Sequence, residues 1–337
     1  MKRALDIEQP AQLTDYLREC GHLAPDEQVQ ARVLTGGVSN RTVLVERQNG
    51  EAWVLKQALT KLRVPTPWFS SPERVHREAL GLRWLSRLLP ADSVPDFLFE
   101  DYDHDLFAMR AVPEPHSNWK QLLLSGEIAP NCVTEFGRLL RTLHESSRRN
   151  RSELETLFSD TTFFEALRLE PYYSYTAGQI PGARSFLEAL VQETQANRTS
   201  LVHGDYSPKN ILVRNGRLVL LDHEVIHWGD PAFDLGFSLA HLLSKAHWLV
   251  SLRTRFREAA ALYWLSYGDA GFEARAVRHT LGCLLARAAG RSPLEYLNEK
   301  ARTRQVAVVL RLLARPPARV LDLIERFCSS DLTASQG

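Results

Sequence analysis

The fold of this chain is indicated by one stretch, Leu201-Val-His-Gly-Asp-Tyr-Ser-Pro-Lys-Asn-Ile-Leu-Val-Arg-Asn-Gly-Arg-Leu-Val-Leu-Leu-Asp222. Two short aliphatic runs, 211–214 and 217–221, flank Asn215-Gly216, and Asn-Gly is the strongest two-residue signal for a β-hairpin. Counting pairs back from this turn places Asn210 opposite Leu221. We therefore expect a polar loop followed by a hairpin.

Three polar residues gather around this hairpin. Asn210 and Asp222 are expected to meet at its open end, and Asp205 lies in the loop just before it. Two carboxylates and an amide oxygen are hard ligands, which Mg²⁺ accepts together with substrate phosphates. The competing interpretation is an Asx-rich loop beside an exposed hairpin, because Asp, Asn and Pro are common in turns. All three residues in one short stretch favour the metal and phosphate site.

The spacing H-G-D-x-x-x-x-N, followed by a strand pair that ends in Asp222, resembles the catalytic and metal-binding loops of kinases. With Gly229-Asp-Pro-Ala-Phe-Asp-Leu-Gly236 close behind, the chain is similar to the aminoglycoside phosphotransferase and choline kinase superfamily. The resemblance implies that Asp205 is the catalytic base that orients the acceptor hydroxyl, and that Asn210 and Asp222 bind Mg²⁺ beside ATP. It also implies an α+β, bilobal, protein-kinase-like fold. A small antiparallel-sheet N-lobe with one long helix would precede a larger, mainly helical C-lobe.

A second Asn-Gly pair, Asn49-Gly50, predicts a hairpin between the segments 31–46 and 51–56. Counting outward from this turn places Lys56 opposite Val43, a few residues from a glycine turn. Glycines let backbone N–H groups approach a phosphate closely, and a lysine on the adjacent strand neutralises it; the alternative is a simple hairpin turn. By the resemblance, Lys56 contacts ATP, and the phosphate-covering loop contains Gly36, Gly37, Ser39 and Asn40.

The segment Pro72 to Leu89 predicts an amphipathic helix with a carboxylate on its apolar face. That residue is Glu78, and a carboxylate that points inward needs a cation. Lys56 is the expected partner, as in the kinase lysine–glutamate pair. The alternative is a surface pair between Glu78 and Arg74, four residues earlier.

Two helices are expected to begin with a capping residue followed by proline. Ser71 precedes Pro72, and Asp230 precedes Pro231. Asp234 falls in the first turn of the second helix, where the helix dipole favours a carboxylate. We interpret Asp230 and Asp234 as structural residues that hold the catalytic loop in place.

Two strands are expected around the turn at residues 101–105, and the segment after them marks the passage between lobes. Pro113 and Pro115 favour a boundary near residue 112. Residues 1–112 are then a nucleotide-binding lobe, and residues 113–337 a catalytic and substrate-binding lobe. By the resemblance, the hinge whose backbone binds adenine comprises Met109, Arg110, Ala111 and Val112.

The short distance between two motifs restricts the acceptor. Only seven residues separate Asp222 from Asp230, which leaves no room for the segment on which a protein kinase docks a peptide. We therefore expect a small-molecule acceptor with a hydroxyl group, such as a sugar or an amino alcohol. Partial resemblance to methylthioribose kinase, in 54–59, 169–172 and 281–290, makes methylthioribose one candidate. The alternative function is a nucleotide-binding pseudokinase that regulates a partner protein.

The charge of the C-terminal region bears on the acceptor. From Arg253 to Arg319 there are thirteen Lys and Arg against five Asp and Glu, an excess of eight in a chain of net charge +1. Such a region favours a neutral or anionic acceptor over a polycation, unless the arginines lie on solvated helix faces. Arg287 is the candidate acceptor ligand, because Ala286-Arg287 falls where methylthioribose kinases carry a pair of arginines.

Composition adds only broad limits. Of the 337 residues, 44% are hydrophobic and 24% charged, as in ordinary globular proteins, and the net charge gives no case for nucleic-acid or membrane binding. The four cysteines are scattered, without a C-x-x-C pair, as expected for reduced thiols in a cytoplasmic protein. No apolar segment follows Met1-Lys-Arg, so no signal peptide is expected.

Overall fold

A computed structural model describes residues 5–35, 37–64 and 67–329. The chain divides into two compact units: unit 1 comprises Met1–His116 with Leu221–Glu224, and unit 2 comprises Ser117–Leu220 with Val225–Gly337. The chain thus returns to unit 1 for four residues that include Asp222. The lobe roles assigned to residues 1–112 and 113–337 stay a prediction.

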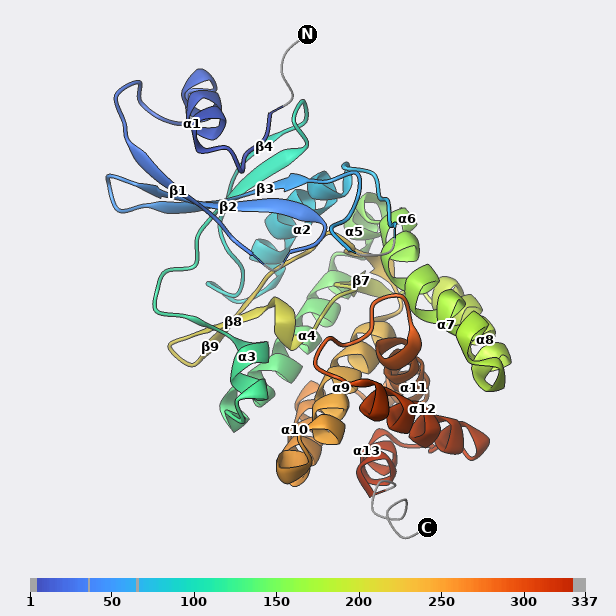
Figure 1. Ribbon diagram of the computed structural model, residues 1–337. Helices are drawn as coiled ribbons and strands as arrows, with labels where there is room; N and C mark the ends of the chain where they lie inside the picture. Colours follow the sequence, from blue (N-terminus) through green and yellow to red (C-terminus); the bar gives the residue numbers. More distant parts are fainter. Residues whose placement is uncertain (1–4, 36, 65–66, 330–337) are drawn as a thin grey trace. The chain divides into compact units, whose positions relative to one another are not determined.

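Unit 1 is an antiparallel sheet with one helix on each face (Figure 1). The strand order is β1-β2-β3-β5-β4. The elements are α1 (Pro10–Glu19), β1 (Val29–Val33), β2 (Asn40–Arg47), β3 (Ala52–Ala58), α2 (Arg74–Leu88), β4 (Phe97–Asp101) and β5 (Leu106–Arg110). Leu55 packs in the core with Leu13 and Leu17 of α1. Because side chains alternate along a strand, the next residue, Lys56, points to the opposite face, where α2 packs.

The predicted register of the β2–β3 hairpin is wrong by one residue. Lys56 pairs with Thr42, and Val43 pairs with Leu55. The reason is the turn: Gly50 alone has a left-handed φ, 84°, and its N–H donates to Arg47 O at 3.0 Å. The loop therefore has three residues with glycine in the left-handed position, instead of the two-residue turn that Asn-Gly predicts.

Helix α2 begins two residues later than predicted. It begins at Arg74 with Glu73 at the N-cap position, and Ser71 Oγ, the predicted cap, accepts the N–H of Glu73 at 3.3 Å. Pro72 and Glu73 instead form a tighter turn, in which Val75 N–H donates to Pro72 O at 3.0 Å. Such 3₁₀ turns are common at helix starts and displace the boundary that a sequence indicates.

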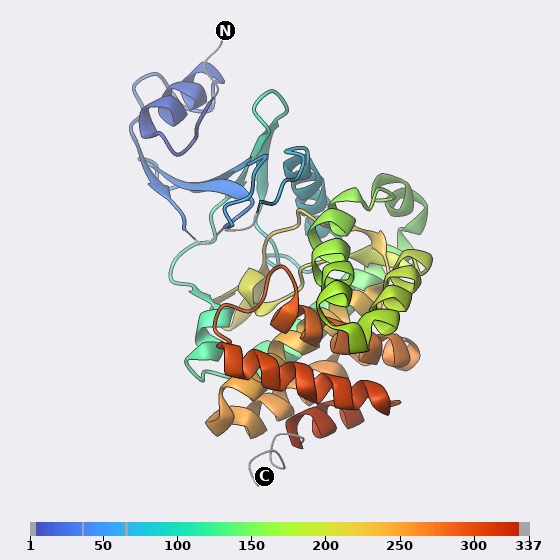
Figure 2. The same cartoon turned by 45° about the vertical axis from the view of Figure 1, so that its right-hand side comes forward.

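Unit 2 is mainly helical, with short strands (Figures 1 and 2). Its helices are α3 (Trp119–Leu124), α4 (Pro130–Arg149), α5 (Arg151–Leu157), α6 (Thr162–Phe164), the π-helix η1 (Glu165–Ser174), α7 (Tyr175–Gln179), α8 (Arg184–Ala196), α9 (Pro231–Trp248), α10 (Arg253–Tyr267), α11 (Glu273–Ala289), α12 (Glu299–Ala314) and α13 (Val320–Ser329). Its 3₁₀ turns are η2 (Pro181–Ala183), η3 (Pro208–Asn210), η4 (Val250–Leu252) and η5 (Ala270–Phe272). Its strands are β6 (Ser117–Asn118), β7 (Ser200–Val202), β8 (Ile211–Arg214), β9 (Arg217–Leu220) and β10 (His227–Gly229).

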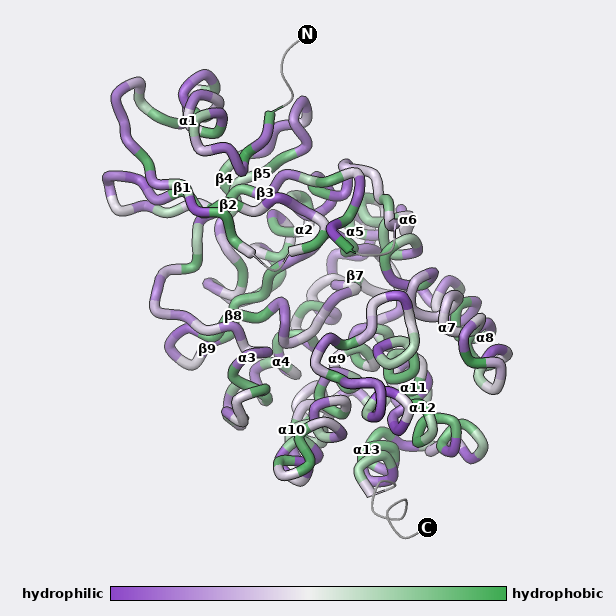
Figure 3. Tube along the Cα trace, viewed as in Figure 1, coloured by the Kyte–Doolittle hydropathy of each residue, from purple (hydrophilic) through white to green (hydrophobic). Residues whose placement is uncertain are grey.

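Helix α9 forms the centre of unit 2. Every residue from Pro231 to His247 is buried, and α10 and α11 pack against it. Helix α13, which the sequence did not indicate, is amphipathic, with green and purple segments in Figure 3. Its buried residues Leu323 and Phe327 face the rest of unit 2, because α13 packs on α9, α10 and α11.

The β8–β9 hairpin has the predicted register, from Arg214 opposite Arg217 to Ile211 opposite Leu220. Asn215 and Gly216 both have left-handed φ values, 50° and 75°, as a two-residue type I′ turn requires. The α+β class, with an antiparallel sheet and a mainly helical remainder, is confirmed. In the part of the chain that the structure describes, no helix combines the length and the apolarity needed to span a bilayer.

Candidate functional site

The predicted pair of Lys56 and Glu78 is formed in unit 1. Lys56 Nζ donates to Glu78 Oε1 at 2.5 Å and to Asp222 Oδ1 at 3.0 Å. Strand β3 and helix α2 position the pair, and Glu78 is almost fully buried. The alternative pair of Glu78 with Arg74 is not formed, because Arg74 Nε binds Glu224 Oε2 at 3.2 Å.

Carboxylates dominate the electrostatics around Lys56. Burial alone would lower the pKa of Lys56, but the charges of Asp222 and Glu78 raise it, so the ammonium stays protonated. Burial raises the pKa of Glu78, and the nearby Asp222 and Glu224 add to this, while Lys56 opposes it. Glu78 Oε2 is buried without a hydrogen-bond partner among the described residues. This surplus of carboxylate oxygens suits a further cation.

Arg74 is a buried residue of this site that sequence reasoning missed. Its guanidinium donates to the carbonyl oxygens of Ser39, of Leu59 at 2.8 Å and of Ser71 at 2.9 Å, as well as to Glu224. It therefore ties the end of the predicted glycine loop to α2. The sequence did contain a signal: a residue four positions before an inward-pointing glutamate lies on the same helix face.

The predicted glycine loop is only partly described. Gly36 lies outside the described residues, and a side chain at Gly37 would meet nothing closer than 3.8 Å. Ser39 and Asn40 are buried, and Asn40 Oδ1 has no hydrogen-bond partner among the described residues. Phosphate binding by this loop stays a prediction.

The predicted hinge runs on from β5. Met109 is buried and lies opposite Val54 in the sheet. Arg110 is exposed, and its Nη1 forms an ion pair with Glu51 Oε1 at 2.9 Å. The N–H groups of Arg110 and Ala111 already donate to backbone oxygens at 2.8 Å. Those two donors are therefore engaged within unit 1, and a bound adenine would use other groups, such as carbonyls and the N–H of Val112.

In unit 2, Asp234 holds the loop that carries Asp205. Its carboxylate accepts the N–H of His203 at 2.7 Å and the N–H of Gly204 at 2.8 Å. Gly204 has φ 77°, and a Cβ there would lie 2.9 Å from a methyl group of Val225, so this loop requires glycine. The buried His203 accepts the N–H of Asp205 at 3.1 Å, which agrees with an orienting role.

Asp205 contacts two side chains through one oxygen. Its Oδ2 accepts Asn210 Nδ2 at 2.8 Å and pairs with Arg168 Nη2 at 2.8 Å. Arg168 also donates to Gly204 O at 2.9 Å. No sequence signal indicated Arg168, because its approach depends on the π-helix η1, and such helices occur frequently at functional sites.

Asn210 and Asp222 are the two predicted ligands of a divalent cation. Both amide hydrogens of Asn210 go to Asp205, to its carbonyl at 3.0 Å and to its carboxylate, so Oδ1 is the atom left for a cation. Asp222, in unit 1, has a left-handed backbone, φ 69°, as strained residues at functional sites often do. Within the described ranges, no group of three or more His, Cys, Asp or Glu suits a metal. Binding of Mg²⁺ by these two residues stays a prediction, in which nucleotide phosphates would complete the ligand shell.

Arg287 lies in unit 2 beside the aromatic residues of η1. Its Nη1 donates to the hydroxyl of Tyr172 at 3.0 Å and to Ser292 O at 2.5 Å. The guanidinium carbons of Arg287 and Arg168 lie 5.5 and 5.8 Å from the centroid of the Tyr172 ring. One tyrosine thus joins the predicted acceptor ligand to the arginine that binds Asp205.

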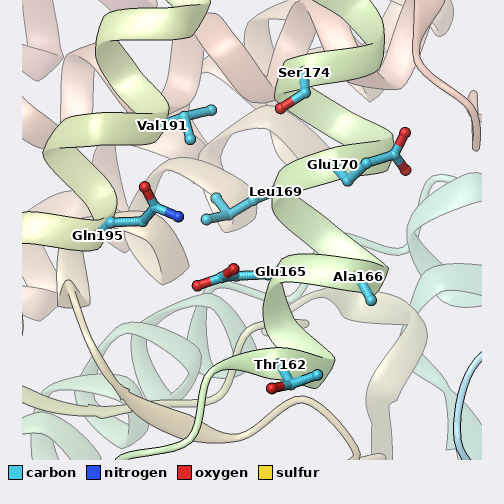
Figure 4. A pocket seen from close by; sticks show the side chains of 8 residues that line it. All are labelled: Thr162, Glu165, Ala166, Leu169, Glu170, Ser174, Val191 and Gln195. Atoms are coloured by element: carbon cyan, nitrogen blue, oxygen red, sulfur yellow. The ribbon is translucent and has the colours of Figure 1, made fainter.

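A hollow of about 410 Å³ lies on another face of η1 (Figure 4). Glu165 and Leu169 point toward Val191 and Gln195 of α8, whereas Glu170 points away from them. None of the residues predicted to bind nucleotide, metal or acceptor lines this hollow.

Known proteins resemble this chain in sequence and in fold. Methylthioribose kinases of Pectobacterium carotovorum and Yersinia pseudotuberculosis are 27% and 25% identical over 274 and 260 residues. These alignments cover 73% and 69% of this chain and 68% and 63% of the relatives. The solved structure of an amicoumacin kinase with AMP-PNP and Ca²⁺ has a TM-score of 0.61 at 13% identity, covering 93% of this chain and 96% of that one. A choline kinase of Streptococcus pneumoniae has a TM-score of 0.52 at 14% identity, covering 89% and 99%.

The structural likenesses confirm the kinase-like fold that the motifs predicted. The sequence model of the phosphotransferase enzyme family, APH, matches residues 30–278, which include Lys56, Glu78, Asp205, Asn210 and Asp222. The chain therefore belongs to the phosphotransferase enzyme family.

Proposed function

We propose that this phosphotransferase is a small-molecule kinase that transfers the γ-phosphoryl group of ATP to a hydroxyl of a sugar or an amino alcohol. The observation that carries the proposal is the setting of Asp205. Asp234 fixes the loop backbone, and Asn210 and Arg168 hold Oδ2. Asp205 Oδ1 remains available to accept a hydrogen bond from an acceptor hydroxyl.

In the proposed reaction, the acceptor oxygen forms a bond to the γ-phosphorus, and the bond from that phosphorus to the bridging oxygen of ADP breaks. Asp205 orients the hydroxyl and receives its proton. Lys56, held by Glu78, binds the nucleotide phosphates. Asp222 and Asn210 would hold Mg²⁺, which supplies positive charge to the phosphate oxygens when bound.

Methylthioribose is the first acceptor to test, because the curated relatives carry the name methylthioribose kinase. Arg287 and Tyr172 supply donors of the kind that bind sugar hydroxyls. The chain has a single arginine at the position where the motif resembles a pair, so the substrate of the relatives is a candidate and other sugars belong in the same panel.

The test is consumption of Mg-ATP over a panel of pentoses, sugar acids, amino alcohols and methylthioribose. We expect at least one compound to raise ATP consumption well above the rate with water alone, with formation of its phosphate ester seen by mass spectrometry. Tight binding of Mg-ATP with no phosphorylated product across the panel would instead support the pseudokinase alternative.

A further inference from the structure

A group of cationic and aromatic side chains in unit 2 includes Arg287, the predicted acceptor ligand. It comprises Lys245 and His241 of α9, Arg287 of α11 and Tyr296 of the 290–298 segment, and is called the Lys245 cluster below. The segment that contains Tyr296 arches between α11 and α12 (Figure 2). It packs through the buried residues Leu294 and Leu297, against which the partly buried Trp248 lies.

Lys245 is fully buried without a carboxylate partner. Its Nζ donates to His241 O, in its own helix, at 3.2 Å and lies 5.4 Å from the centroid of the Tyr296 ring. No Asp or Glu of the described residues forms an ion pair with it. A nearby carboxylate, Glu295, contacts Lys120 instead. A buried ammonium without a counter-charge destabilises a fold, whereas an apolar residue would pack there without that cost.

Each of the other members has one buried polar atom without a hydrogen-bond partner in the described part of the chain. His241 Nε2, Arg287 Nε and the hydroxyl of Tyr296 are all buried, and none has a partner among the described residues. Two of these atoms, Arg287 Nε and the Tyr296 hydroxyl, are donors. An unpaired buried donor loses its hydration without compensation, so the cluster has positive charge and unpaired donors but no carboxylate among the described residues that pairs with Lys245 or Arg287.

The charge environment supports this description. Burial lowers the pKa of Lys245 to about 7, Lys120 and Arg287 lower it further, and Glu295 opposes them. Burial, reinforced by Arg287 and Lys245, also lowers the pKa of His241, which keeps its ring neutral. An anion placed among these groups would favour the protonated form of Lys245.

The cluster is connected to the proposed catalytic base. Arg287 binds the Tyr172 hydroxyl at 3.0 Å, and the Tyr172 ring lies beside Arg168, which pairs with Asp205 at 2.8 Å. All of these residues belong to unit 2. The site expected for the acceptor hydroxyl, at Asp205, is thus connected to the cluster through Arg168 and Tyr172.

We propose that Lys245, Arg287 and Tyr296 form an anion-binding subsite, which binds the carboxylate or phosphate group of the acceptor whose hydroxyl Asp205 activates. This inference rests on the proposed kinase function and narrows its substrate class to hydroxy acids and sugar phosphates. It does not fit a cationic acceptor, because two buried positive charges would repel it.

The first experiment measures anion binding without catalysis. The full-length protein is unfolded thermally near neutral pH in inorganic phosphate, in acetate or in chloride, at constant ionic strength. We expect phosphate, acetate or both to raise the Tm of the wild-type protein in a saturable manner. Lys245→Met should have a higher Tm than the wild type in chloride and should lose the anion-dependent increase.

Lys300→Met is the matched control, because Lys300 is exposed on α12. This variant should respond to the anions as the wild type does. An equal anion response in Lys245→Met would overturn the subsite, and so would a Tm in chloride clearly below that of the wild type.

The second experiment compares matched acceptors with Mg-ATP: ribose, ribonate and ribose 5-phosphate. The neutral sugar is the reference, and the other two distinguish a carboxylate from a phosphate. We expect one anionic acceptor to have a kcat/KM about 10-fold or more above that of ribose, the effect of one charge-assisted hydrogen bond. Lys245→Met should remove this preference by raising the acceptor KM, with the KM for ATP unchanged.

The outcomes separate the two proposals. Phosphorylation of ribose and of the anionic acceptors with similar kcat/KM, unaffected by Lys245→Met, would overturn the subsite and leave the kinase function in place. No phosphorylation of any acceptor, together with phosphate stabilisation that Lys245→Met abolishes, would overturn the kinase function and support the subsite.

Discussion

The two side-chain contacts of Asp205 fall on the same oxygen, which gives the carboxylate one anchored and one available atom. Arg168 brings a positive charge to the anchored oxygen Oδ2, at 2.8 Å. Asn210 joins two roles, because its amide nitrogen anchors Asp205 and its oxygen faces the other way. Under the proposed mechanism, Asn210 would therefore connect the base to the metal without a further side chain.

Asp205→Asn should leave Mg-ATP binding nearly unchanged and lower kcat about 10²-fold or more, because an amide cannot accept the hydroxyl proton. Calorimetric titration with Mg-ATP and steady-state turnover of an identified acceptor measure the two effects. Turnover close to that of the wild type would remove Asp205 from the mechanism.

The two proposed metal ligands should differ in their response to metal. Asp222→Ala should be inactive at any practical Mg²⁺ concentration, because a carboxylate contributes charge that the ion requires. Asn210→Ala, which loses a neutral ligand, should recover part of its activity at high Mg²⁺ or with Mn²⁺. Activity measured across a metal titration gives the ranking, and full recovery of Asp222→Ala would reverse it.

Lys245 should make stability depend on pH. Burial lowers its pKa to about 7 in the folded chain, against 10.5 for an ordinary lysine, so between these values the unfolded chain holds a proton that the folded chain has released. The unfolding free energy should therefore rise with pH across this window, by about 1 kcal/mol per pH unit, and should carry the full penalty below it. The charged groups facing Lys245 are Lys120, Glu295 and Arg287, from outside its own helix.

Urea unfolding of the wild type and Lys245→Met at several pH values tests this. The variant should lack the rise, so the two stability curves converge as pH increases toward 10.5. Parallel curves would show that Lys245 does not titrate in this window.

At the scale of elements, α2 is positioned by two buried charges on one face. Glu78 contacts β3 through Lys56, and Arg74 contacts the ends of the loops at Ser39 and Leu59. At the helix start, the side chain of the N-cap residue Glu73 makes no capping hydrogen bond, and Ser71 Oγ accepts the N–H of Glu73 at 3.3 Å. The helix is therefore held in register by long-range polar contacts as much as by its apolar stripe.

Arg74→Met should lower the unfolding free energy by about 3–5 kcal/mol, because it removes a buried charge that binds Glu224 and donates to several buried carbonyl groups. Arg87→Met is the control, since Arg87 is exposed on the same helix and its guanidinium lies over the face of Trp84. Chemical denaturation compares them. If Arg74→Met lowered the unfolding free energy as little as Arg87→Met does, long-range contacts of Arg74 would not hold α2 in place.

At the scale of the molecule, the basic residues between Arg253 and Arg319 differ in whether they pair with a carboxylate. Several of its arginines pair with carboxylates outside the segment, namely Arg257 with Glu325, Arg275 with Asp230, Arg278 with Glu193 and Arg291 with Glu170. The alternative of arginines on partly solvated faces thus accounts for part of the excess. Arg287, by contrast, is a buried member of this segment, and among the described residues it pairs with no carboxylate.

A buried subsite should show a weak response to salt. We expect kcat/KM for an anionic acceptor to change less than about 3-fold from low to physiological ionic strength, because buried charges are poorly screened. Kanamycin, a polycation, should not be phosphorylated at a measurable rate. Steady-state kinetics over a salt series is the measurement, and efficient use of kanamycin would overturn the charge argument.

The sequence by itself determined whatever depends on local geometry. The turn at Asn215-Gly216 set the register of β8 and β9, and helix periodicity placed Glu78 toward Lys56. Prediction failed where one local pattern allows two conformations. Asn49-Gly50 formed a three-residue loop with Gly50 alone in the left-handed region, and the register moved by one residue.

Only the tertiary structure decided which distant charges meet. Arg168 reaches Asp205 through a π-helix, and Lys245 is buried because the 290–298 segment packs over α9. Neither fact has a local signature, since an arginine or a lysine in a helix is ordinarily solvated. Their positions depend on contacts between segments tens of residues apart, and burial, which changes the energy of a charge most strongly, is a property of the folded chain alone.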